Sequence, residues 1–438
     1  MSEALTKTGF DEEALAALPP ASPFVEGLRK RGLEDFRVLP IPSQETEEWR
    51  YTDLSDFEID FTPFAAGAQA ETLDDVPEEI LAGIGHLGDR SGLQIQHNST
   101  VTMSHLEPDL ASRGVVLTSL DRALEEYPDL VEERLHGLVP SDRTKFTALH
   151  AAFRSGGTFV YVPRDVHVEL PLQTIIYVGA EGLAVFPHTV ILLDQGAELT
   201  FIDRYVSPRL SRAFSDAVAE LYLGANSRLG YVALQDWGEG MTHLSVQRAR
   251  VGRDAQLRSL EVAFGGTLAR AEVESVLEGD GGSSEMLGVY FGDGDQHIDH
   301  RSIQDHVGNR TSSDLLYKGA LKDRSQAIYT GTVIIEKGAH LCDAYQTNRN
   351  ILLSETAKAH SVPNLEILTN DPTRCGHAAS VGPVDEDELF YLQTRGIPRD
   401  EAVRLIVTGF FREVLDRVEL EEIRTTLERA IEAEVETA

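Results

Sequence analysis

The sequence predicts a mainly β protein whose core is a β-helix, a solenoid of stacked strands, with helical segments at both ends of the chain. Short β-rich runs fill residues 158 to about 370, and small residues recur among them at a near-constant spacing. Helical periodicity replaces this pattern before residue 60 and after residue 385. Strands repeated at a fixed period stack coil upon coil and bury a continuous core.

Residues 1–145 are expected to form a helical prefix followed by an α/β lead-in. The first helical run ends at Pro19 and Pro20, since proline cannot continue a helix. The second run carries apolar residues at helical spacing, and the pattern after about residue 60 is mixed. The expected helices lie at 11–18, 23–36, 120–127 and 130–135, and a strand-like run lies at 114–117.

Residues 146–384 form the predicted β-helix. Turn residues separate its apolar runs, and a small residue marks each repeat. The successive spacings of this marker are 28 and 30 positions and then 84 positions, which is three times 28. A recurring coil explains the spacing, and a β-sandwich with chance spacing is the alternative. The marker residues are Ala197, Ala225, Ala255, Ser283, Thr311 and Ala339.

Residues 385–438 are expected to form a C-terminal helical domain. Asp385 to Glu388 supply acidic residues for a first helical turn, and residues 401–415 carry apolar side chains at helical spacing. An acidic helix runs from about residue 418 onward. A pair of helices with apolar faces either caps an end of the β-helix or presents a docking surface to another subunit.

The charge balance disfavours two classes of partner. The chain has 438 residues, 72 of them acidic and 39 basic, for a formal charge of -33, and only seven of the basic residues are lysines. Nucleic acids and anionic membranes repel such a surface. Acidic residues spread along the whole chain are typical of proteins solvated at high salt, so we expect a halophilic source.

The sequence also predicts a soluble protein of the cytoplasm. The N-terminus lacks a basic segment followed by an apolar stretch, and no apolar run approaches the roughly 20 residues of a membrane span. The only cysteines, Cys342 and Cys375, are too few for a disulfide framework, which fits a reducing compartment.

Cys375 and His377 form the most suggestive chemical element. They are two positions apart, so they face the same side of an extended strand, and thiolate and imidazole both suit iron or zinc. Two ligands do not complete a metal site, so Cys342 or another chain would have to add more. The alternative is a small buried thiol beside an unrelated histidine.

A second group of candidates combines His297, His300 and His306 with the aspartates around them. His300 and His306 share strand parity and His297 does not. In so acidic a protein, a solvated rim of the β-helix is favoured over a metal site. A carbohydrate-active β-helix enzyme that uses Asp293, Asp295 or Asp299 with calcium is a rival interpretation. The missing export signal weighs against it.

No phosphate-binding loop or G-x-S-x-G elbow occurs, so ATP chemistry would belong to a partner.

Several motifs together resemble the SufB/SufD family. The segments 375–382 and 387–397 are similar to its C-terminal signature. Further similarity lies at 48–52, 145–153, 313–319 and 343–354, so that the likeness covers most of the chain and thins between about 60 and 140. SufB-type chains typically carry glutamate after the histidine, whereas Ala378 follows His377 here, so the chain resembles the SufD type.

The resemblance implies a right-handed parallel β-helix flanked by helical domains, and a scaffold subunit rather than an enzyme. It implies pairing with a SufB-like subunit, with His377 and, more weakly, Cys375 facing the interface where iron or a nascent cluster assembles. No cofactor is expected to stay bound, only transient iron or an iron-sulfur cluster, and the family allows a reduced flavin. A homodimer in which the histidine has no chemistry is the alternative.

The resemblance also implies that a SufC-like ATPase binds through the C-terminal helical domain. The residues expected to contact this partner are Phe390, Tyr391, Arg395, Gly396 and Phe410. A departure from the family pattern is found at Cys342, where a small hydroxyl residue is common. The role of Cys342 as a ligand is therefore in doubt.

Overall fold

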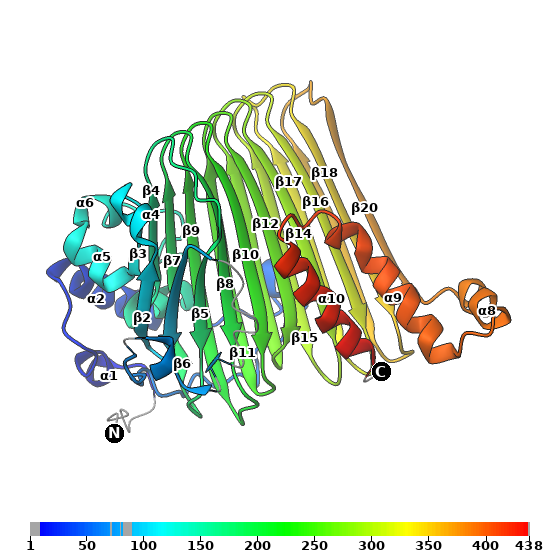
Figure 1. The fold of residues 1–438 in the computed structure, drawn as a ribbon, viewed down its shortest axis with the longest axis horizontal. Helices are drawn as coiled ribbons and strands as arrows, with labels where there is room; N and C mark the ends of the chain where they lie inside the picture. The colour runs from blue at the N-terminus through cyan, green and yellow to red at the C-terminus, as the bar shows by residue number, and fades with distance from the viewer. Residues whose placement is uncertain (1–8, 71, 79, 82–89, 437–438) are drawn as a thin grey trace.

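The computed structural model describes residues 9–70, 72–78, 80–81 and 90–436. Its core is a parallel β-helix with two sheets of ten strands, and helices lie at both ends of the chain (Figure 1). Successive strands of the chain alternate between the two sheets over most of the core, as a solenoid requires. The predicted fold class is confirmed, and the β-sandwich alternative is wrong.

The two sheets share the strands as follows. The first sheet contains, in spatial order, β2 (Thr100–Leu106), β1 (Gly92–His97), β5 (Leu172–Tyr177), β8 (Glu198–Val206), β10 (Arg228–Trp237), β12 (Gln256–Gly265), β14 (Ser283–Gly292), β16 (Ser312–Leu321), β18 (Asp343–Leu352) and β20 (Arg374–Pro383). The second contains β19 (Lys358–Ile367), β17 (Gln326–Ile335), β15 (His297–His306), β13 (Leu268–Leu277), β11 (Met241–Val251), β9 (Ala213–Leu223), β7 (His188–Leu193), β4 (Thr158–Val162) and β3 (Val116–Ser119), with β6 (Ala184–Val185) beside β9.

The strand register confirms the period of the repeat but changes its markers. Glu198 and Arg228, the first residues of β8 and β10, pair with each other. The residues that precede them, Ala197 and Ser227, therefore lie side by side. Ala225, Ser283 and Ala339 therefore lie one to three positions from the true column, because the turns differ in length. The column of small residues that runs up this edge is Ala197, Ser227, Ala255, Gly282, Thr311 and Cys342.

Helices and antiparallel strands cover the N-terminal end of the β-helix. Strands β2 and β3 pair antiparallel with β1 and β4 and end the two sheets. A cluster of buried aromatic residues joins the helices to the first coils, with Phe153, Phe186 and Phe214 fully buried. The helices of this region are α1 (Glu12–Ala16), α2 (Pro23–Val38), α4 (Pro108–Ser112), α5 (Leu120–Glu126), α6 (Pro128–Val131) and α7 (Lys145–Phe153), with short 3-10 turns at Glu47–Trp49 and Leu73–Asp75.

Two of the C-terminal helices, α9 (Arg399–Leu415) and α10 (Glu421–Glu436), lie along the outer face of the first sheet (Figure 1). The helix before them, α8 (Glu386–Thr394), projects beyond β20. Apolar residues of α9 and α10, such as Phe411 and Leu427, pack against Val262 and Val289 of the sheet. Lys318 Nζ donates to the carbonyl of Phe410 at 2.8 Å, and Lys322 Nζ donates to that of Glu434 at 2.9 Å.

Of the two alternatives for the helix pair, the one in which it caps an end of the β-helix is therefore wrong, because its apolar residues pack against the outer face of the first sheet. No helix within the described part of the chain is both long and apolar enough to cross a membrane. The predicted segment boundaries at residues 145 and 384 stay predictions.

Candidate functional site

The last coil of the β-helix, formed by β19 and β20, is its open end. Each of these strands is hydrogen-bonded to the sheet on one side only, β19 to β17 and β20 to β18. No residue of either strand is buried, whereas alternate residues of β18 are. An edge with unpaired backbone groups is a template for another strand or chain. Pro363 lies within β19, where it removes one donor from that edge.

Both predicted ligands lie on the inward-facing side of β20. Cys375 is paired with Ala344 and His377 with Gln346, and those two residues of β18 are buried. The described residues place no further coil above them, and the His377 side chain is exposed while the Cys375 side chain is half-buried. Burial raises the pKa of the Cys375 thiol, so it stays protonated in the isolated chain. Their role as ligands stays a prediction.

Cys342 lies one coil deeper and is fully buried in the column of small residues. Its sulfur accepts a hydrogen bond from the Thr311 hydroxyl at 3.2 Å and lies 3.5 Å from the carbonyl oxygen of Gly308. Cys375 packs against the apolar cluster that contains Cys342. These contacts give Cys342 a packing role, in line with the doubt about it as a ligand.

The open end also receives residues from near the N-terminus. The Tyr51 ring stacks on the His360 ring of β19 at a centroid distance of 5.4 Å. The neighbouring Thr52 hydroxyl donates to Asp299 at 2.5 Å, and the Arg270 guanidinium lies 4.1 Å from the centroid of the Trp49 ring. The motif at residues 48–52 thus braces the second sheet beside the last coil.

The histidines of β15 do not form one site. His300 and His306 are buried, so the interpretation of all three as a solvated rim is wrong for these two. His306 contacts the hydroxyl groups of Thr311 and Ser313 at 2.7 and 2.8 Å, while His300 lies against tyrosine rings. His297 contacts Thr52 at 3.0 Å. The inward face of β15 is part of the core.

The aspartates of the rival calcium interpretation are each paired with a basic side chain. Asp295 binds Arg324 at 2.5 Å, Asp299 binds Arg270, and Asp293 lies 4.0 Å from Lys322. They do not converge on a common point in the described residues, where the only metal-competent group contains none of them. The geometry gives no support to a calcium-dependent enzyme.

Four of the five predicted partner residues are exposed on or after α8. Phe390 and Tyr391 are 67% and 57% exposed, and Arg395 stacks on the Tyr391 ring at 5.1 Å. Gly396, with φ of +87°, ends the helix in a left-handed conformation. Phe410 is half-buried instead, because Lys318 lies 4.8 Å from the centroid of its ring. Their role in binding stays a prediction.

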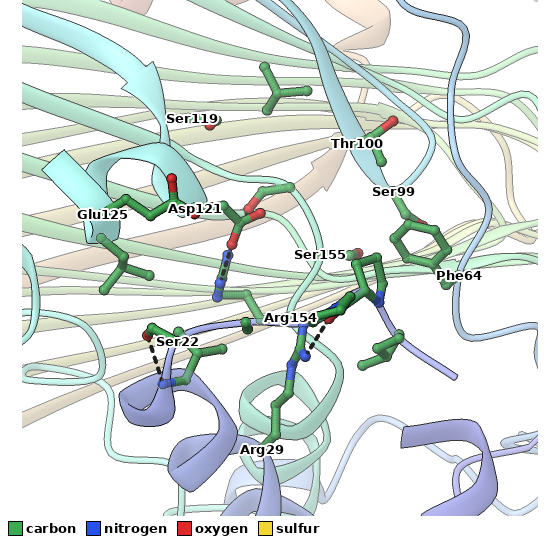
Figure 2. A pocket seen from close by; sticks show the side chains of 18 of the residues that line it. Ser22, Arg29, Phe64, Ser99, Thr100, Ser119, Asp121, Glu125, Arg154 and Ser155 are labelled. Atoms are coloured by element: carbon green, nitrogen blue, oxygen red, sulfur yellow. Dashed lines mark hydrogen bonds and ion pairs between the residues drawn. The ribbon is translucent and has the colours of Figure 1, made fainter. Parts of the chain in front are cut away.

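A cavity of about 320 Å³ lies near the opposite end of the β-helix, between α2, α5 and the end of α7 (Figure 2). Two arginines line it. Arg154 donates to Asp121 at 2.6 Å, and Arg29 donates to the carbonyl of Pro19 at 2.8 Å. Both guanidinium groups are thus bound within the chain, and the expectation of a reduced flavin stays a prediction.

Comparison with known proteins decides the family. The model of the SUF system FeS cluster assembly SufBD core domain matches residues 176–410, and the model of the SufBD protein N-terminal region matches residues 10–174. The chain belongs to the SufBD family of iron-sulfur cluster assembly proteins. The core match spans all strands from β7 to β20, so the open end is part of the family's shared domain.

Relatives within the family include SufD itself. The iron-sulfur cluster assembly protein SufD of Bacillus subtilis is 31% identical over 98% of this chain and 99% of its own length. A SufBD family protein of Mycobacterium tuberculosis is 36% identical over 68% of this chain and 76% of its own. One from Staphylococcus saprophyticus is 27% identical over 93% and 88%. The chain is a SufD homologue, as its motifs predicted.

One group of residues was missed by the sequence reasoning. His136, His150 and His188 come together in the structure with ligand nitrogens within 4.8 Å of one another. They lie 14 and 38 positions apart on a loop, a helix and a strand, so no local motif marks them. Only the three-dimensional fold brings them together.

Proposed function

We propose that this chain is a SufD-type scaffold subunit that pairs with a SufB-like subunit through the open end of the β-helix. The observation that carries the proposal is the last coil, whose inward-facing residues have no covering coil. A single chain rarely leaves two parallel edge strands unprotected, so a second β-helix that continues the stack is the natural cover.

His377 would then contribute an imidazole to a site shared between two chains, with Cys375 in second place. Both lie on the side of β20 that a following coil would face. A SufB-like chain would add the thiolates and carboxylates that this chain lacks, for transient iron or an iron-sulfur cluster. A site completed only by a partner binds its cargo reversibly, as a donor scaffold requires.

The SufC-like ATPase would dock on α8 and the adjoining part of α9. Phe390, Tyr391 and Arg395 form an exposed aromatic and basic surface there, and a groove lined by Asp387, Glu388, Leu392 and Ile406 lies beside it. ATP binding and hydrolysis belong to that partner, which would reshape the interface between the two β-helical subunits. We assign the assembled complex to the cytoplasm, with a surface adapted to high salt.

Co-purification with the SufB-like and SufC-like partners, under anaerobic conditions in molar salt, tests the proposal. The His377→Ala complex is expected to form but to carry less iron and sulfide than the wild-type complex. His340→Ala is the matched control, because His340 is also exposed and near the open end but pairs with Asp371 outside β20. Equal iron content in the His377→Ala and His340→Ala complexes would mean that the chain has only a structural role. A chain that forms only homodimers would refute the pairing with a SufB-like subunit.

A further inference from the structure

Three histidine side chains converge near the covered end of the β-helix. His136 lies in the loop after α6, His150 lies in α7 and His188 begins β7. Their ring centroids are 4.9 to 5.7 Å apart, and the ring planes meet at angles of 64° to 87°. Within the described parts of the chain this is the only group of three or more histidine, cysteine or acidic residues whose ligand atoms meet.

Hydrogen bonds to backbone carbonyl oxygens determine which ring nitrogens of His136 and His150 carry protons. His136 Nδ1 lies 3.0 Å from the carbonyl oxygen of Val139, and His150 Nδ1 lies 2.9 Å from that of Asp216. A carbonyl oxygen can only accept, so both Nδ1 atoms donate. The Nε2 atoms of His136 and His150 therefore carry lone pairs, and His150 Nε2 faces His188.

Glu220 fixes His188 in the same way. Its carboxylate accepts backbone N–H groups of His136, Leu138 and Val139 at 2.6 to 2.9 Å, and His188 Nε2 lies 2.9 Å from its Oε2 atom. An ionised carboxylate makes His188 Nε2 the donor and leaves the lone pair on Nδ1. The His188 Nδ1 atom lies 3.1 Å from His150 Nε2, so that the two lone pairs face each other.

Two facing lone pairs need a cation or a proton between them. The carboxylate to histidine contact and the carbonyl contacts match the outer-shell partners that orient metal-binding histidines. A proton is the competing occupant: a protonated Glu220 could donate to His188, which would then donate to His150. The structure is thus set up for one of two occupants, and the third lone pair, on His136, has no use in the proton relay.

We propose that His136, His150 and His188 bind one divalent first-row transition cation, of the Zn²⁺ class. Three neutral imidazoles suit zinc, iron, nickel and copper, and they leave a fourth position open in a tetrahedral site. Ligand nitrogens at about 2.0–2.1 Å from one ion are about 3.3 Å apart, close to the 3.1 Å between His150 and His188. His136 completes the site if its ligand nitrogen, which lies within 4.8 Å of those of His150 and His188, moves closer to them.

The backbone and charges around the cluster support this assignment. His136 has φ of +61°, a left-handed conformation that few non-glycine residues adopt, although histidine is enriched among them, and its N–H group donates to Glu220. Burial holds the pKa of His136 down to about 4 and those of His150 and His188 well below their ordinary value. The Arg154 guanidinium adds to this lowering, and Asp121 pairs with it at 2.6 Å. On the other side, burial raises the pKa of Glu220, while His136 and the three backbone N–H groups that donate to this carboxylate act to lower it.

The site would anchor the loop between α6 and α7 to β7 and β9. It lies near the end of the β-helix opposite His377, as the positions of β7 and β20 in Figure 1 show. The inference is therefore independent of the proposed pairing at the open end. His136 as a whole residue is half-buried, whereas His150 and His188 are fully buried.

Co²⁺ and Zn²⁺ titration of the chelator-treated full-length chain tests the site. We expect one ion per chain, with the intense visible bands of four-coordinate Co²⁺ and a higher thermal midpoint with Zn²⁺. His136→Asn is the first variant, since asparagine tolerates the left-handed backbone, and His188→Gln is the second. Both are expected to weaken binding at least a hundredfold.

The control is His105→Gln, an exposed histidine of β2 that lies outside both proposed sites. It is expected to bind the ion as the wild type does. Circular dichroism checks that His136→Asn remains folded. A wild-type chain that binds no more Co²⁺ than His136→Asn would overturn the site in favour of the proton relay. Binding lost in His377→Ala and retained in His136→Asn would also overturn it.

Discussion

At the N-terminal end of the β-helix, antiparallel strands and aromatic-rich helices cover the first coils. At the C-terminal end the described residues add no further strand to β19 or β20, although the Tyr51 ring stacks on His360 of β19. The chain has helices available at both ends. Its C-terminal helices pack on the outer face of the first sheet and leave the last coil uncovered (Figure 1).

The two ends of the β-helix therefore differ in whether their edge strands are accessible to another chain. A covered end prevents other chains from pairing with the edge strands, and an uncovered end invites such pairing. Aromatic packing concentrates at the covered end, and residues with ligand chemistry, His377 and Cys375, lie at the uncovered one. Four predictions test or sharpen this comparison.

The largest effect is expected from a phenylalanine at the covered end. Phe214 of β9 is fully buried, with ring centroids of Phe57 and Phe61 at 5.3 and 5.5 Å. Phe214→Ala should lower the free energy of unfolding by about 3–5 kcal/mol, since it removes a large buried side chain and leaves a cavity. Denaturant unfolding of the isolated chain measures the change.

The matched control is the same substitution beyond the open end. Phe390 of α8 is 67% exposed, so Phe390→Ala should change the stability by about 0.5 kcal/mol or less. A loss as large as that of Phe214→Ala would mean that α8 is packed in the isolated chain, and would weaken the contrast between the two ends.

The second prediction concerns association at the open end. Val381 of β20 is 41% exposed and would be covered by a SufB-like subunit. Val381→Asp buries an unpaired charge in that interface and should weaken it by about 3 kcal/mol, roughly a hundredfold in Kd. Binding of the labelled chain to its partner at fixed salt measures the effect.

Val307→Asp is the control for this variant. Val307 is also 41% exposed but lies in the turn after β15, away from β20. It should bind the partner as the wild type does, and the unfolding of both isolated variants should match the wild type within about 0.5 kcal/mol. Equal weakening by both variants would point to a general charge effect and not to the open end.

The third prediction compares the interior coils with the last coil through one substitution. A Cβ atom at Gly319 of β16 would lie 1.9 Å from the Tyr290 ring, which is buried and held by Asn348 and Asn350. Gly319→Ala should cost about 1–3 kcal/mol through overpacking. At Gly382 of β20 no atom lies within 4 Å of an added Cβ, so Gly382→Ala should be close to neutral.

Thermal unfolding of the two glycine variants checks this directly. A destabilised Gly382→Ala chain would show that the last coil is packed against something even when the protein is alone, for example a second copy. The experiment separates an open end from one that is covered by a homodimer.

The sequence predicted the repeat well, because coils of nearly equal length leave a readable spacing. It misplaced Ala225, Ser283 and Ala339 by one to three positions, since turn lengths vary from coil to coil and the small residue of the true column moves with them. The shared side of Cys375 and His377 followed from strand parity alone.

The placement of the C-terminal helices, the burial of the β15 histidines and the grouping of three distant histidines depend on packing that sequence patterns do not encode. An apolar helix face, such as that of residues 401–415, is equally satisfied by the end of a solenoid or by the outer face of a sheet. The burial of His300 and His306 depends on which side of β15 faces the core. The grouping of His136, His150 and His188 depends on contacts between a loop, a helix and a strand.

The smallest change in the free energy of unfolding is expected at Asp305 of β15, on the side of the β-helix. Burial and the nearby carboxylates of Glu336, Glu274 and Glu278 raise its pKa to about 6. The folded chain therefore binds more protons than the unfolded chain between about pH 4 and 6, and this part of the stability is lost as the pH rises through that window. Above it the folded state keeps a destabilising charge.

Asp305→Asn should therefore stabilise the chain at pH 8, by about 1 kcal/mol once solvent screening of this half-buried group is allowed for, and should have little effect at pH 4. The gain should shrink in molar salt, because salt screens the like charges that raise the pKa. Unfolding at both pH values and at low and high salt measures the four combinations. A gain that did not depend on salt would assign the shift to burial alone and would remove one support for a surface adapted to high salt.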